Sequence, residues 1–469
     1  MKQEVLTALK NIVGEDYILS GKENIQSYVF DEVEPLCRPV PDYHSIVVKP
    51  ANPEEIAEIM KCANRFRVPV VVRGGGTGLC GACTPTEESI ILCVERLNKI
   101  IEIDRKNMVA VLEAGVTLSD LLEELSKYEG LCFPVHPGDE GCQMGGMAVM
   151  NAGGARAVRH GVTRKQIMGL EIVTPTGEIM ELGGKMIKNN AGYNLKELII
   201  GSEGTLAIVT KVILKIYPLD PYSATILAPF ESFEDASDTV VELLATGNIP
   251  LAVEYQDKWL FVNTAKMLGK VWQAEKGNAD LLIILSERTE DALYNTVREV
   301  NQICKAHNSY ALLYAGRQEE QEELMYIRNQ HWELIKDIEG HSFDMAVPVG
   351  EIPAFLKELK DLVAEYNTVT NVTAHIADGN IHSDIVLVDG KLPKYTEELK
   401  LKMFETCFRH HGTITGEHGI GKMRVQELKL QKSKAELDLM RGIKKVFDPN
   451  LILNPGTVID FEEGELQSC

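Results

Sequence analysis

Two histidines, His375 and His382, flank an Asp-Gly pair, Asp378-Gly379, that is typical of a β-hairpin turn. A loop made of these two residues alone would place His375 directly opposite His382 on one face of the hairpin. Their Cβ atoms would then lie roughly 4.5–5.5 Å apart, and two imidazoles at that spacing could share a divalent metal ion. The alternative is a pair of hairpin histidines that only cap a sheet.

A third metal ligand could come from Glu417, in the glycine-flanked stretch 412–421. Two histidines and one carboxylate leave coordination positions open, which suits a metal ion that handles a substrate. Zn²⁺, Fe²⁺ and Mn²⁺ all accept this ligand set, with Zn²⁺ or Fe²⁺ as the first expectation. The neighbouring His418 is a candidate general base, because the ordinary pKa of an imidazole lies near physiological pH.

Three glycine-dense stretches between residues 73 and 210 predict a large cofactor that carries phosphate. The first follows a predicted helix, with Asn52 as its N-cap and Pro53 at its first position, and a predicted buried strand. It contains a formal GxGxxG motif that begins at Gly76. A Rossmann site would need a helix that opens on this motif, but Pro85 intervenes and residues 89–94 have the pattern of a strand. A glycine run without a helix still lets successive backbone N–H groups converge on a pyrophosphate. Any one stretch by itself could be a tight turn.

The motifs HIADGNIH (375–382) and TGEHGIGK (415–422) resemble the FAD-linked D-2-hydroxyacid dehydrogenases, a family of D-lactate dehydrogenases, glycolate oxidase flavin subunits and D-2-hydroxyglutarate dehydrogenases. The resemblance covers nearly the whole chain. It implies an α+β fold with a FAD-binding domain of the vanillyl-alcohol-oxidase or p-cresol methylhydroxylase type. We accordingly expect a FAD-binding domain at 1–218, an α+β substrate or cap domain at 219–410, and a segment at 411–469 that completes the active site and returns to the FAD domain.

The same resemblance assigns the flavin contacts. It implies that the Arg-Gly-rich loop holds the pyrophosphate and that the GSEGTL region lines the flavin. Some relatives attach FAD covalently through a histidine in the first loop, and Thr77 takes that place here, so we expect non-covalent FAD. The expected cofactor-binding residues are Arg73, Gly74, Gly75, Gly76, Thr77, Gly78, Pro137, Gly138, Gly141, Gly145, Gly146, Asn151, Gly153, Gly204, Ile208 and Asn454.

The resemblance also implies how the substrate is held. Arg328, on a charged helix expected over 320–337, matches the family's carboxylate-binding arginine. Without that match, an arginine on such a helix could be a surface residue. Relatives that take a dicarboxylate carry a lysine shortly before the strand at 344–348, but here residues 341–343 are His-Ser-Phe. The bulky Trp332 follows Arg328 by one helical turn. We therefore expect a substrate with a small apolar tail, D-lactate as first choice and glycolate as second.

The expected reaction is the FAD-dependent oxidation of D-lactate to pyruvate, with metal-assisted loss of the hydroxyl proton to His418 and hydride transfer to flavin N5. Asp384, two residues beyond His382, could assist as a second-shell partner, act as an extra ligand, or be a solvated edge charge. Three alternatives stay open: a glycolate oxidase flavin subunit, a flavin electron-transfer subunit with an unused substrate site, and a zinc-stapled protein without enzymatic activity.

Composition limits the partners. A net charge of −21 argues against nucleic acid and anionic membranes, which would repel such a chain. No run approaches the roughly 20 apolar residues of a membrane span, and the first residues lack a signal-peptide core, so we expect a cytoplasmic protein. The ten cysteines show no iron–sulfur spacing, and the pair Cys80-Cys83 suits a structural role. Reduced FAD must then pass electrons to a partner, for which we expect an electron-transferring flavoprotein, in a bifurcating assembly or alone.

Overall fold

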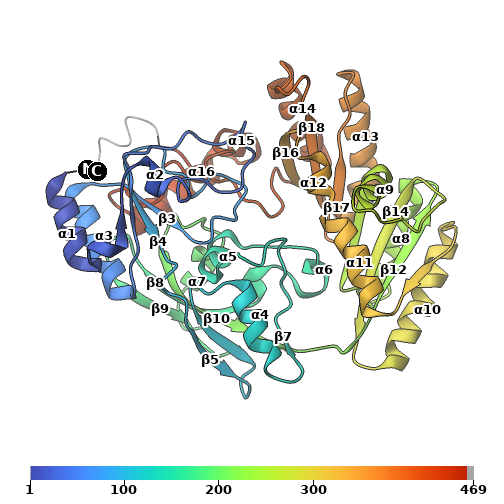
Figure 1. Cartoon of the computed structure of the whole chain (residues 1–469), viewed down its shortest axis with the longest axis horizontal. Coiled ribbons are helices and arrows are strands. Elements are labelled where there is room, and N and C mark those ends of the chain that lie inside the picture. The colour runs from blue at the N-terminus through green and yellow to red at the C-terminus, as the bar shows by residue number, and fades with distance from the viewer. Residues whose placement is uncertain (1, 462–469) are drawn as a thin grey trace. The chain divides into compact units, whose positions relative to one another are not determined.

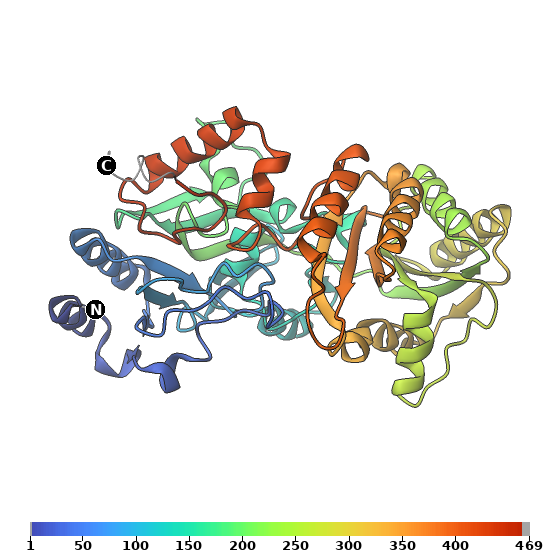
Figure 2. The same ribbon diagram turned by 90° about the horizontal axis from the view of Figure 1, so that it is seen from above.

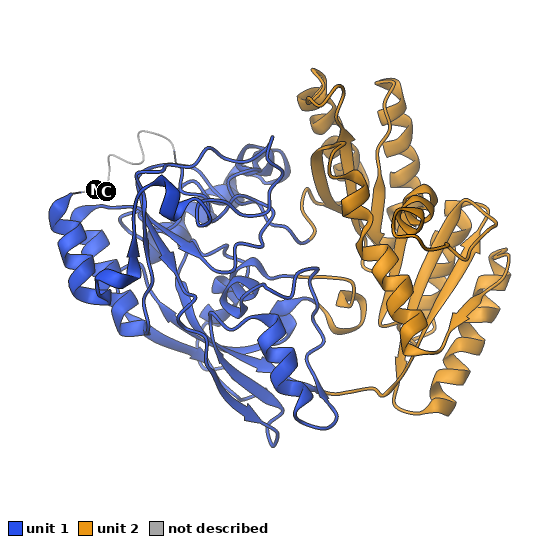
Figure 3. Cartoon of the chain, in the orientation of Figure 1, with its two compact units in different colours: residues 1–152, 162–217, 417–469 blue, residues 153–161, 218–416 orange. Residues whose placement is uncertain are grey.

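The computed structural model describes residues 2–461, and the chain separates into two compact units (Figure 3). Unit 1 consists of Met1–Ala152, Val162–Tyr217 and Glu417–Cys469, and unit 2 of Gly153–Gly161 and Pro218–Gly416. Both units combine helices with β-sheets (Figure 1). The assignment of FAD binding to 1–218, substrate covering to 219–410 and closure of the active site to 411–469 stays a prediction.

Unit 1 contains two main sheets. A four-stranded sheet has the order β1-β2-β4-β3, with β4 parallel to β2 and β3, and an antiparallel sheet has the order β5-β6-β10-β8-β9. Its strands are β1 Ile18–Leu19, β2 Ile46–Val48, β3 Val70–Arg73, β4 Ile90–Cys93, β5 Ile100–Asp104, β6 Val109–Glu113, β7 Leu131–Cys132, β8 Ile167–Val173, β9 Ile179–Gly183 and β10 Ile208–Lys215. Its α-helices are α1 Gln3–Val13, α2 Lys22–Ile25, α3 Pro53–Phe66, α4 Leu118–Ser126, α5 Met144–Met150, α7 Leu195–Ile199, α15 Val425–Gln431 and α16 Lys434–Phe447.

The predicted approach to the first glycine stretch is confirmed. Asn52 caps α3 by accepting a hydrogen bond from the Glu55 amide at 2.8 Å, and Pro53 occupies the first helical turn. The helix leads into the buried strand β3. Residues 74–89 then contain no helix before β4 begins, which confirms that the GxGxxG motif is not a Rossmann fingerprint.

A buried lysine holds the C-terminal part of unit 1 against the rest of the unit through hydrogen bonds. Lys444, on α16, donates to the carbonyl oxygens of Thr205 (2.7 Å) and Leu453 (2.8 Å) and to the Asp448 carboxylate (2.6 Å). Leu453 in turn pairs with Val70 of β3 in a parallel bridge. The residues that follow α16 are therefore held against the strand that leads into the first glycine stretch.

Unit 2 is built on one antiparallel seven-stranded sheet in the order β15-β12-β14-β13-β17-β18-β16, with helices on both faces (Figures 1 and 2). The short strand β11 (Tyr217–Pro218) pairs with β7 at the start of this unit. The strands are β12 Tyr222–Phe230, β13 Ala252–Asp257, β14 Ala279–Glu287, β15 Leu313–Ala315, β16 Glu339–Ala346, β17 Val372–His375 and β18 Asn380–Val386. The α-helices are α6 Ala157–His160, α8 Phe233–Ala245, α9 Lys258–Met267, α10 Glu290–Ala306, α11 Gln318–Asn329, α12 His331–Ile335, α13 Ile352–Glu365 and α14 Thr396–Arg409.

Strand alternation gives the two faces of this sheet different roles. On β13, Tyr255 points toward α8, where its ring lies 4.8 Å from that of Phe233. Its neighbours Glu254 and Gln256 therefore point to the opposite face, and the Gln256 amide donates to the carbonyl of Arg328 on α11 at 2.9 Å. We call this second face, on β13, β17, β18 and β16, the polar face.

The helix expected over 320–337 is interrupted. Helix α11 ends at Asn329 and α12 begins at His331, with Gln330 in a non-helical conformation. The physical reason is competition for one carbonyl, because the Arg328 oxygen accepts from Gln256 Nε2 and from His331 Nδ1, both at 2.9 Å. The break brings the His331 imidazole to the polar face.

No helix within residues 2–461 combines the length and the apolar character that crossing a membrane requires.

Candidate functional site

The hairpin that carries His375 and His382 has a different register from the predicted one. β17 and β18 pair Thr373 with His382 and His375 with Asn380, so the loop comprises residues 376–379 and the predicted direct pairing of the two histidines is wrong. A contact remote in sequence fixes this loop: the Gly379 carbonyl accepts from the Val347 amide at 3.1 Å, and a Cβ at Gly379 would lie 2.1 Å from the Val347 oxygen.

A register shift of two residues preserves the face on which a side chain lies. His375 and His382 therefore still point to the polar face, now as diagonal neighbours. Their ring centroids are 5.7 Å apart and the rings are nearly perpendicular, at 88°. The hairpin thus brings the two predicted ligands together by a different pairing.

His375 is directly opposite Glu254 of β13, and its Nδ1 lies 2.7 Å from Glu254 Oε1. The other carboxylate oxygen, Oε2, lies 2.5 Å from Nη2 of Arg328. Burial raises the pKa of Glu254, but the charges and hydrogen bonds of Arg328 and His375 outweigh it and hold the pKa below its ordinary value. Arg328 is thus no free surface arginine.

Four side chains converge next to the hairpin: Asp344, His382, Glu417 and His418 each place a ligand atom within 4.8 Å of the others. Asp344 lies directly opposite His382 on β16, with 3.7 Å between its Oδ1 and His382 Nδ1. Imidazole nitrogens and carboxylate oxygens are the donors that Zn²⁺, Fe²⁺ and Mn²⁺ accept, so this donor set fits a divalent metal ion. His375 is outside this group of four, although its ring lies beside that of His382.

Two buried carboxylates hold the segment on either side of Glu417 and His418. Asp344 accepts hydrogen bonds from the Thr415 hydroxyl (2.8 Å) and the Gly416 amide (3.0 Å). Glu203 accepts from the amides of Ile420 (2.7 Å) and Gly421 (2.6 Å). The short stretch between these points carries the predicted ligand and the predicted base.

The sequence reasoning missed Asp344, Glu203 and Glu254. Asp344 and Glu254 lie in strands without any local motif, and only strand register places them beside the histidines. Glu203 lies inside the GSEGTL stretch that was assigned to the flavin as a whole, and its positive φ of 54° is a signal that only the structure reveals.

Two further titratable groups line the polar face. Asp384 is 7% exposed, which excludes a solvated edge charge, and burial raises its pKa to about 6 against an opposing hydrogen bond from Ser342. Burial, assisted by the charge of Arg328, lowers the pKa of His331 to about 4. His331 is therefore a neutral imidazole at physiological pH.

The predicted flavin residues of the first two glycine stretches lie against each other in unit 1. A Cβ on Gly75 would come within 2.7 Å of the Gly141 carbonyl oxygen, so the backbones of loops 74–78 and 137–141 pack directly. Gly138 and Gly146 face open space instead, with no atom within 4 Å of an added Cβ. Nearby, Gln143 Oε1 is buried without a hydrogen-bond partner among residues 2–461. Bare backbone of this kind fits the phosphate groups of a large cofactor such as FAD, and the Gln143 oxygen suits a hydroxyl or N–H donor of the same cofactor.

Arg73 serves the protein's own loop in this structure. Its Nη1 donates to the Phe30 carbonyl at 2.6 Å and lies 3.4 Å from the Cys83 sulfur. A Cβ on Gly76, where φ is +78°, would collide with the same guanidinium. Thr77 and Gly78 continue this loop, and Pro137 opens the stretch that faces it.

The remaining predicted flavin residues are distributed over the second half of unit 1. Asn454 accepts from the Val72 amide at 2.8 Å and donates to the Glu203 carbonyl at 3.2 Å, which joins β3 to the GSEGTL turn. Gly204 lies in that turn, at φ +68°, and Ile208 begins β10. Asn151 ends α5 in the left-handed region, and Gly145 packs on Ala114. Gly153 is the exception among the predicted flavin residues, because it is the first residue of the segment Gly153–Gly161, which belongs to unit 2.

Cys80 and Cys83 are both free thiols and form no disulfide with each other. Burial raises the pKa of Cys83 to about 11, so its thiol stays protonated at physiological pH. This agrees with the structural role expected for the pair.

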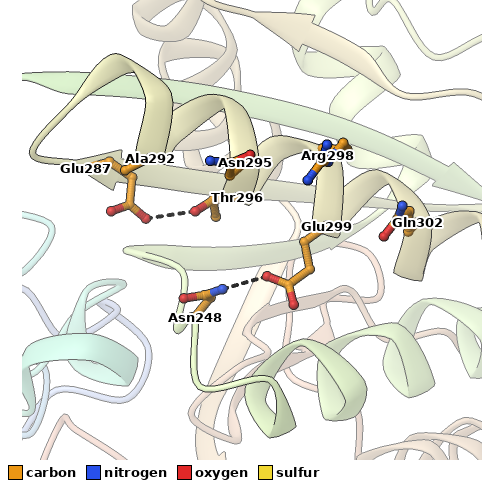
Figure 4. A pocket seen from close by; sticks show the side chains of 8 residues that line it. All are labelled: Asn248, Glu287, Ala292, Asn295, Thr296, Arg298, Glu299 and Gln302. Atoms are coloured by element: carbon orange, nitrogen blue, oxygen red, sulfur yellow. Dashed lines mark hydrogen bonds between the residues drawn. The ribbon is translucent and has the colours of Figure 1, made fainter.

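A separate hollow of about 450 Å³ lies along α10 (Figure 4). Its polar walls include Thr296, which donates to Glu287 at 3.0 Å, and Glu299, which accepts from Asn248. None of the predicted site residues lines it, so it is not the candidate site.

Comparison with known proteins agrees with this geometry. Residues 44–183 match the family described as FAD binding domain, and residues 219–458 match FAD linked oxidases, C-terminal domain. The D-lactate dehydrogenase of Archaeoglobus fulgidus is 36% identical over 433 residues, 92% of this chain and 95% of that protein. The glycolate oxidase subunit GlcD of Bacillus subtilis is 33% identical, over 93% of this chain and 94% of its own length.

A crystal structure of p-cresol methylhydroxylase superposes with a TM-score of 0.79 at 18% identity, over 97% of this chain and 96% of that one. A 4-ethylphenol oxidase from Gulosibacter chungangensis gives 0.78 at 16% identity, over 98% and 97%. These likenesses confirm the predicted α+β fold of the vanillyl-alcohol-oxidase and p-cresol methylhydroxylase type. Together with the two domain matches and the relatives above, they establish that the chain is an FAD-linked oxidoreductase and belongs to the FAD-linked oxidase family of the D-lactate dehydrogenase and glycolate oxidase subunit type.

Proposed function

We propose that the protein oxidises a small D-2-hydroxy acid, with D-lactate to pyruvate as the first choice and glycolate as the second. The observation that carries the proposal is the convergence of Asp344, His382, Glu417 and His418 beside the polar face. Relatives named D-lactate dehydrogenase at 36% and 31% identity support the substrate class, and a D-2-hydroxyglutarate dehydrogenase at 29% extends it.

Each residue has a role that its chemistry can fill. His382 and Glu417, two of the converging residues, would hold a divalent metal ion, Zn²⁺ or Fe²⁺ and alternatively Mn²⁺, together with His375, whose ring centroid lies 5.7 Å from that of His382. The ion would polarise the substrate's oxygen atoms. His418 would take the hydroxyl proton, since a neutral imidazole accepts a proton near physiological pH. Arg328 would bind the substrate carboxylate, for which a guanidinium offers two parallel hydrogen bonds. The bound FAD supplies the two-electron acceptor for the substrate's Cα hydride.

The proposed substrate size is based on Trp332, four residues after Arg328 in the chain, and on Ser342. Trp332 is the second residue of α12, and Ser342 lies on the polar face opposite Asp384. Neither offers a positive charge for a second carboxylate. We therefore propose that the substrate's tail is short and uncharged, as in lactate.

The reduced flavin needs an oxidant, and we propose a redox protein, first an electron-transferring flavoprotein. A plant relative, 29% identical, is named D-lactate dehydrogenase [cytochrome], which makes a cytochrome the natural competitor. Reoxidation of the reduced protein by each of these, and by oxygen, would show which one works at a catalytic rate.

The substrate proposal is tested by mixing the oxidised protein, without oxygen, with D-lactate, L-lactate, glycolate or D-2-hydroxyglutarate and recording the flavin absorbance. We expect D-lactate to bleach the flavin fastest and L-lactate to leave it oxidised. A yellow protein that none of the four reduces would contradict the proposal and favour a flavin electron-transfer subunit. FAD that stays on the protein after acid precipitation would contradict its non-covalent binding.

A further inference from the structure

Glu254 occupies a place that no motif assigns. It lies in the middle of β13, its side chain is fully buried, and each of its two oxygens faces a different predicted site residue. Oε1 is 2.7 Å from Nδ1 of His375, and Oε2 is 2.5 Å from Nη2 of Arg328. One carboxylate therefore connects the predicted metal ligand with the predicted substrate-binding arginine.

The contact with His375 determines which imidazole nitrogen can bind a metal. A carboxylate at Nδ1 accepts the proton of that nitrogen, which makes Nε2 the basic nitrogen and orients the ring. Glu254 and His375 are also directly opposed across the β13–β17 ladder, so the strand register fixes their distance. In metal sites, a carboxylate behind a histidine ligand typically changes metal affinity by about 10–100-fold.

The contact with Arg328 determines where the guanidinium lies. The same strand also holds the arginine's backbone, because Gln256, two residues beyond Glu254, donates to the Arg328 carbonyl at 2.9 Å. The arginine is thus fixed at its main chain and at its side chain by neighbouring residues of β13. A long side chain held at both ends has little freedom left to lose when it binds an anion.

We propose that Glu254 is a positioning residue that couples the metal ligand His375 to the substrate-binding Arg328. The inference rests on the roles proposed above for these two residues. Its consequence is that removal of one charge weakens two separate functions, metal binding through His375 and substrate binding through Arg328. A carboxylate that only stabilises the fold would affect neither function selectively.

The chain offers a matched control on the adjacent strand. Asp280 of β14 is equally buried and accepts from the Trp272 indole at 2.8 Å, with Lys258 at 3.5 Å. It lies opposite Gln256 in the ladder, and its side-chain partners are Trp272 and Lys258. Asp280→Asn therefore reproduces the loss of a buried charge from the same sheet without the proposed coupling.

The experiment compares Glu254→Gln, Glu254→Asp and Asp280→Asn with the unaltered protein, each checked for flavin content and thermal unfolding. Zn²⁺ affinity is measured without substrate, by competition with a chromophoric chelator, and KM and kcat for D-lactate are measured afterwards. We expect Glu254→Gln to lower Zn²⁺ affinity about 10–100-fold and to raise KM more than it lowers kcat. Glu254→Asp should give a smaller loss of both, and Asp280→Asn should keep both while lowering only the unfolding temperature.

A double variant separates the two arms. In a His375→Asn background, Glu254→Gln should cause no further loss of Zn²⁺ affinity, since its partner is already absent, but should still weaken D-lactate binding through Arg328, measured by titration of the flavin absorbance. Unchanged Zn²⁺ affinity and KM in Glu254→Gln, in a protein that otherwise binds Zn²⁺ and oxidises D-lactate, would overturn the inference. An unaltered protein that neither binds Zn²⁺ nor oxidises D-lactate would overturn the proposed function instead.

Discussion

The glycine loops of unit 1 and the polar face of unit 2 are built by different means. In unit 1 the predicted cofactor cradle relies mainly on backbone, at positions such as Gly75 and Gly76 where any side chain would collide. In unit 2 the candidate site consists of side chains from separate strands, Glu254, Asp344 and His382, which only the register brings together. Backbone cradles leave a local mark in the sequence, whereas side-chain constellations depend on pairing between distant segments.

The largest expected effect is a loss of kcat without a loss of flavin. Replacement of the base, His418→Asn, should lower kcat for D-lactate about 10²–10⁴-fold, because general-base catalysis contributes that much, while flavin content stays constant. Steady-state kinetics beside the flavin absorbance would measure both. A suitable control is His410→Asn, since His410 lies at the end of α14, where its ring contacts Glu351, Glu358 and Phe355. Equal activity of both variants would remove His418 from the mechanism.

The second prediction concerns the support of the cradle. Lys444→Met leaves Asp448 and two carbonyl oxygens buried without their partner, so the free energy of unfolding should fall by about 3–5 kcal/mol. The free energy of unfolding would be measured by denaturant titration, with flavin release as the signal. Lys434 of the same helix pairs with Asp438 at the surface, and Lys434→Met should change stability by less than about 0.5 kcal/mol. Similar losses in both variants would show that burial of Lys444 is unimportant.

A substitution at Gly421 tests the segment that Glu203 holds next to His418, with Gly442 as the control position. An Ala at Gly421 would adopt φ +53° and place its Cβ 1.9 Å from the Cys80 carbonyl oxygen, so we expect Gly421→Ala to destabilise the protein by about 1–3 kcal/mol. Gly442 lies within α16 with no atom close to an added Cβ, and Gly442→Ala should stabilise by about 0.5–1 kcal/mol. Opposite signs in thermal unfolding are expected, and stabilisation by both would refute the strain.

The smallest predicted effect is on specificity. Trp332→Thr should improve kcat/KM for D-2-hydroxyglutarate relative to D-lactate by about 10-fold, because it opens space without adding a charge for the second carboxylate. The ratio is obtained by competing the two acids against each other. No change in that ratio would mean that Trp332 does not limit the substrate's tail.

Prediction from sequence succeeded where the signal was local. The cap and proline at Asn52 and Pro53 define the start of α3, and the absence of a helix after Gly76 follows from Pro85 and the strand pattern behind it. The hairpin of His375 and His382 shows the limit. Its existence was predictable from the Asp-Gly pair, but its register depends on a contact between Gly379 and Val347 that no local pattern reveals.

The rest of the candidate site could not be predicted for the same reason. Asp344 and Glu254 lie in strands that carry no local motif, and their importance arises from the ladder partners His382 and His375. The break after Asn329 likewise depends on Gln256, more than seventy residues earlier in the chain. Its side-chain amide donates to the Arg328 carbonyl in place of a backbone amide of the helix. The family resemblance predicted the reaction, and the structure revealed the carboxylates that support the predicted site residues.

We propose that cofactor binding and substrate activation depend on two separate sites, a backbone cradle and a side-chain metal site. The most direct test strips metal ions from the purified protein with a chelator, measures flavin and metal content, and records anaerobic flavin reduction by D-lactate before and after Zn²⁺, Fe²⁺ or Mn²⁺ is restored. We predict that the stripped protein keeps its FAD, is not reduced by D-lactate, and recovers reduction with at least one of the three ions. Full reduction of a metal-free, flavin-loaded protein would contradict the claim.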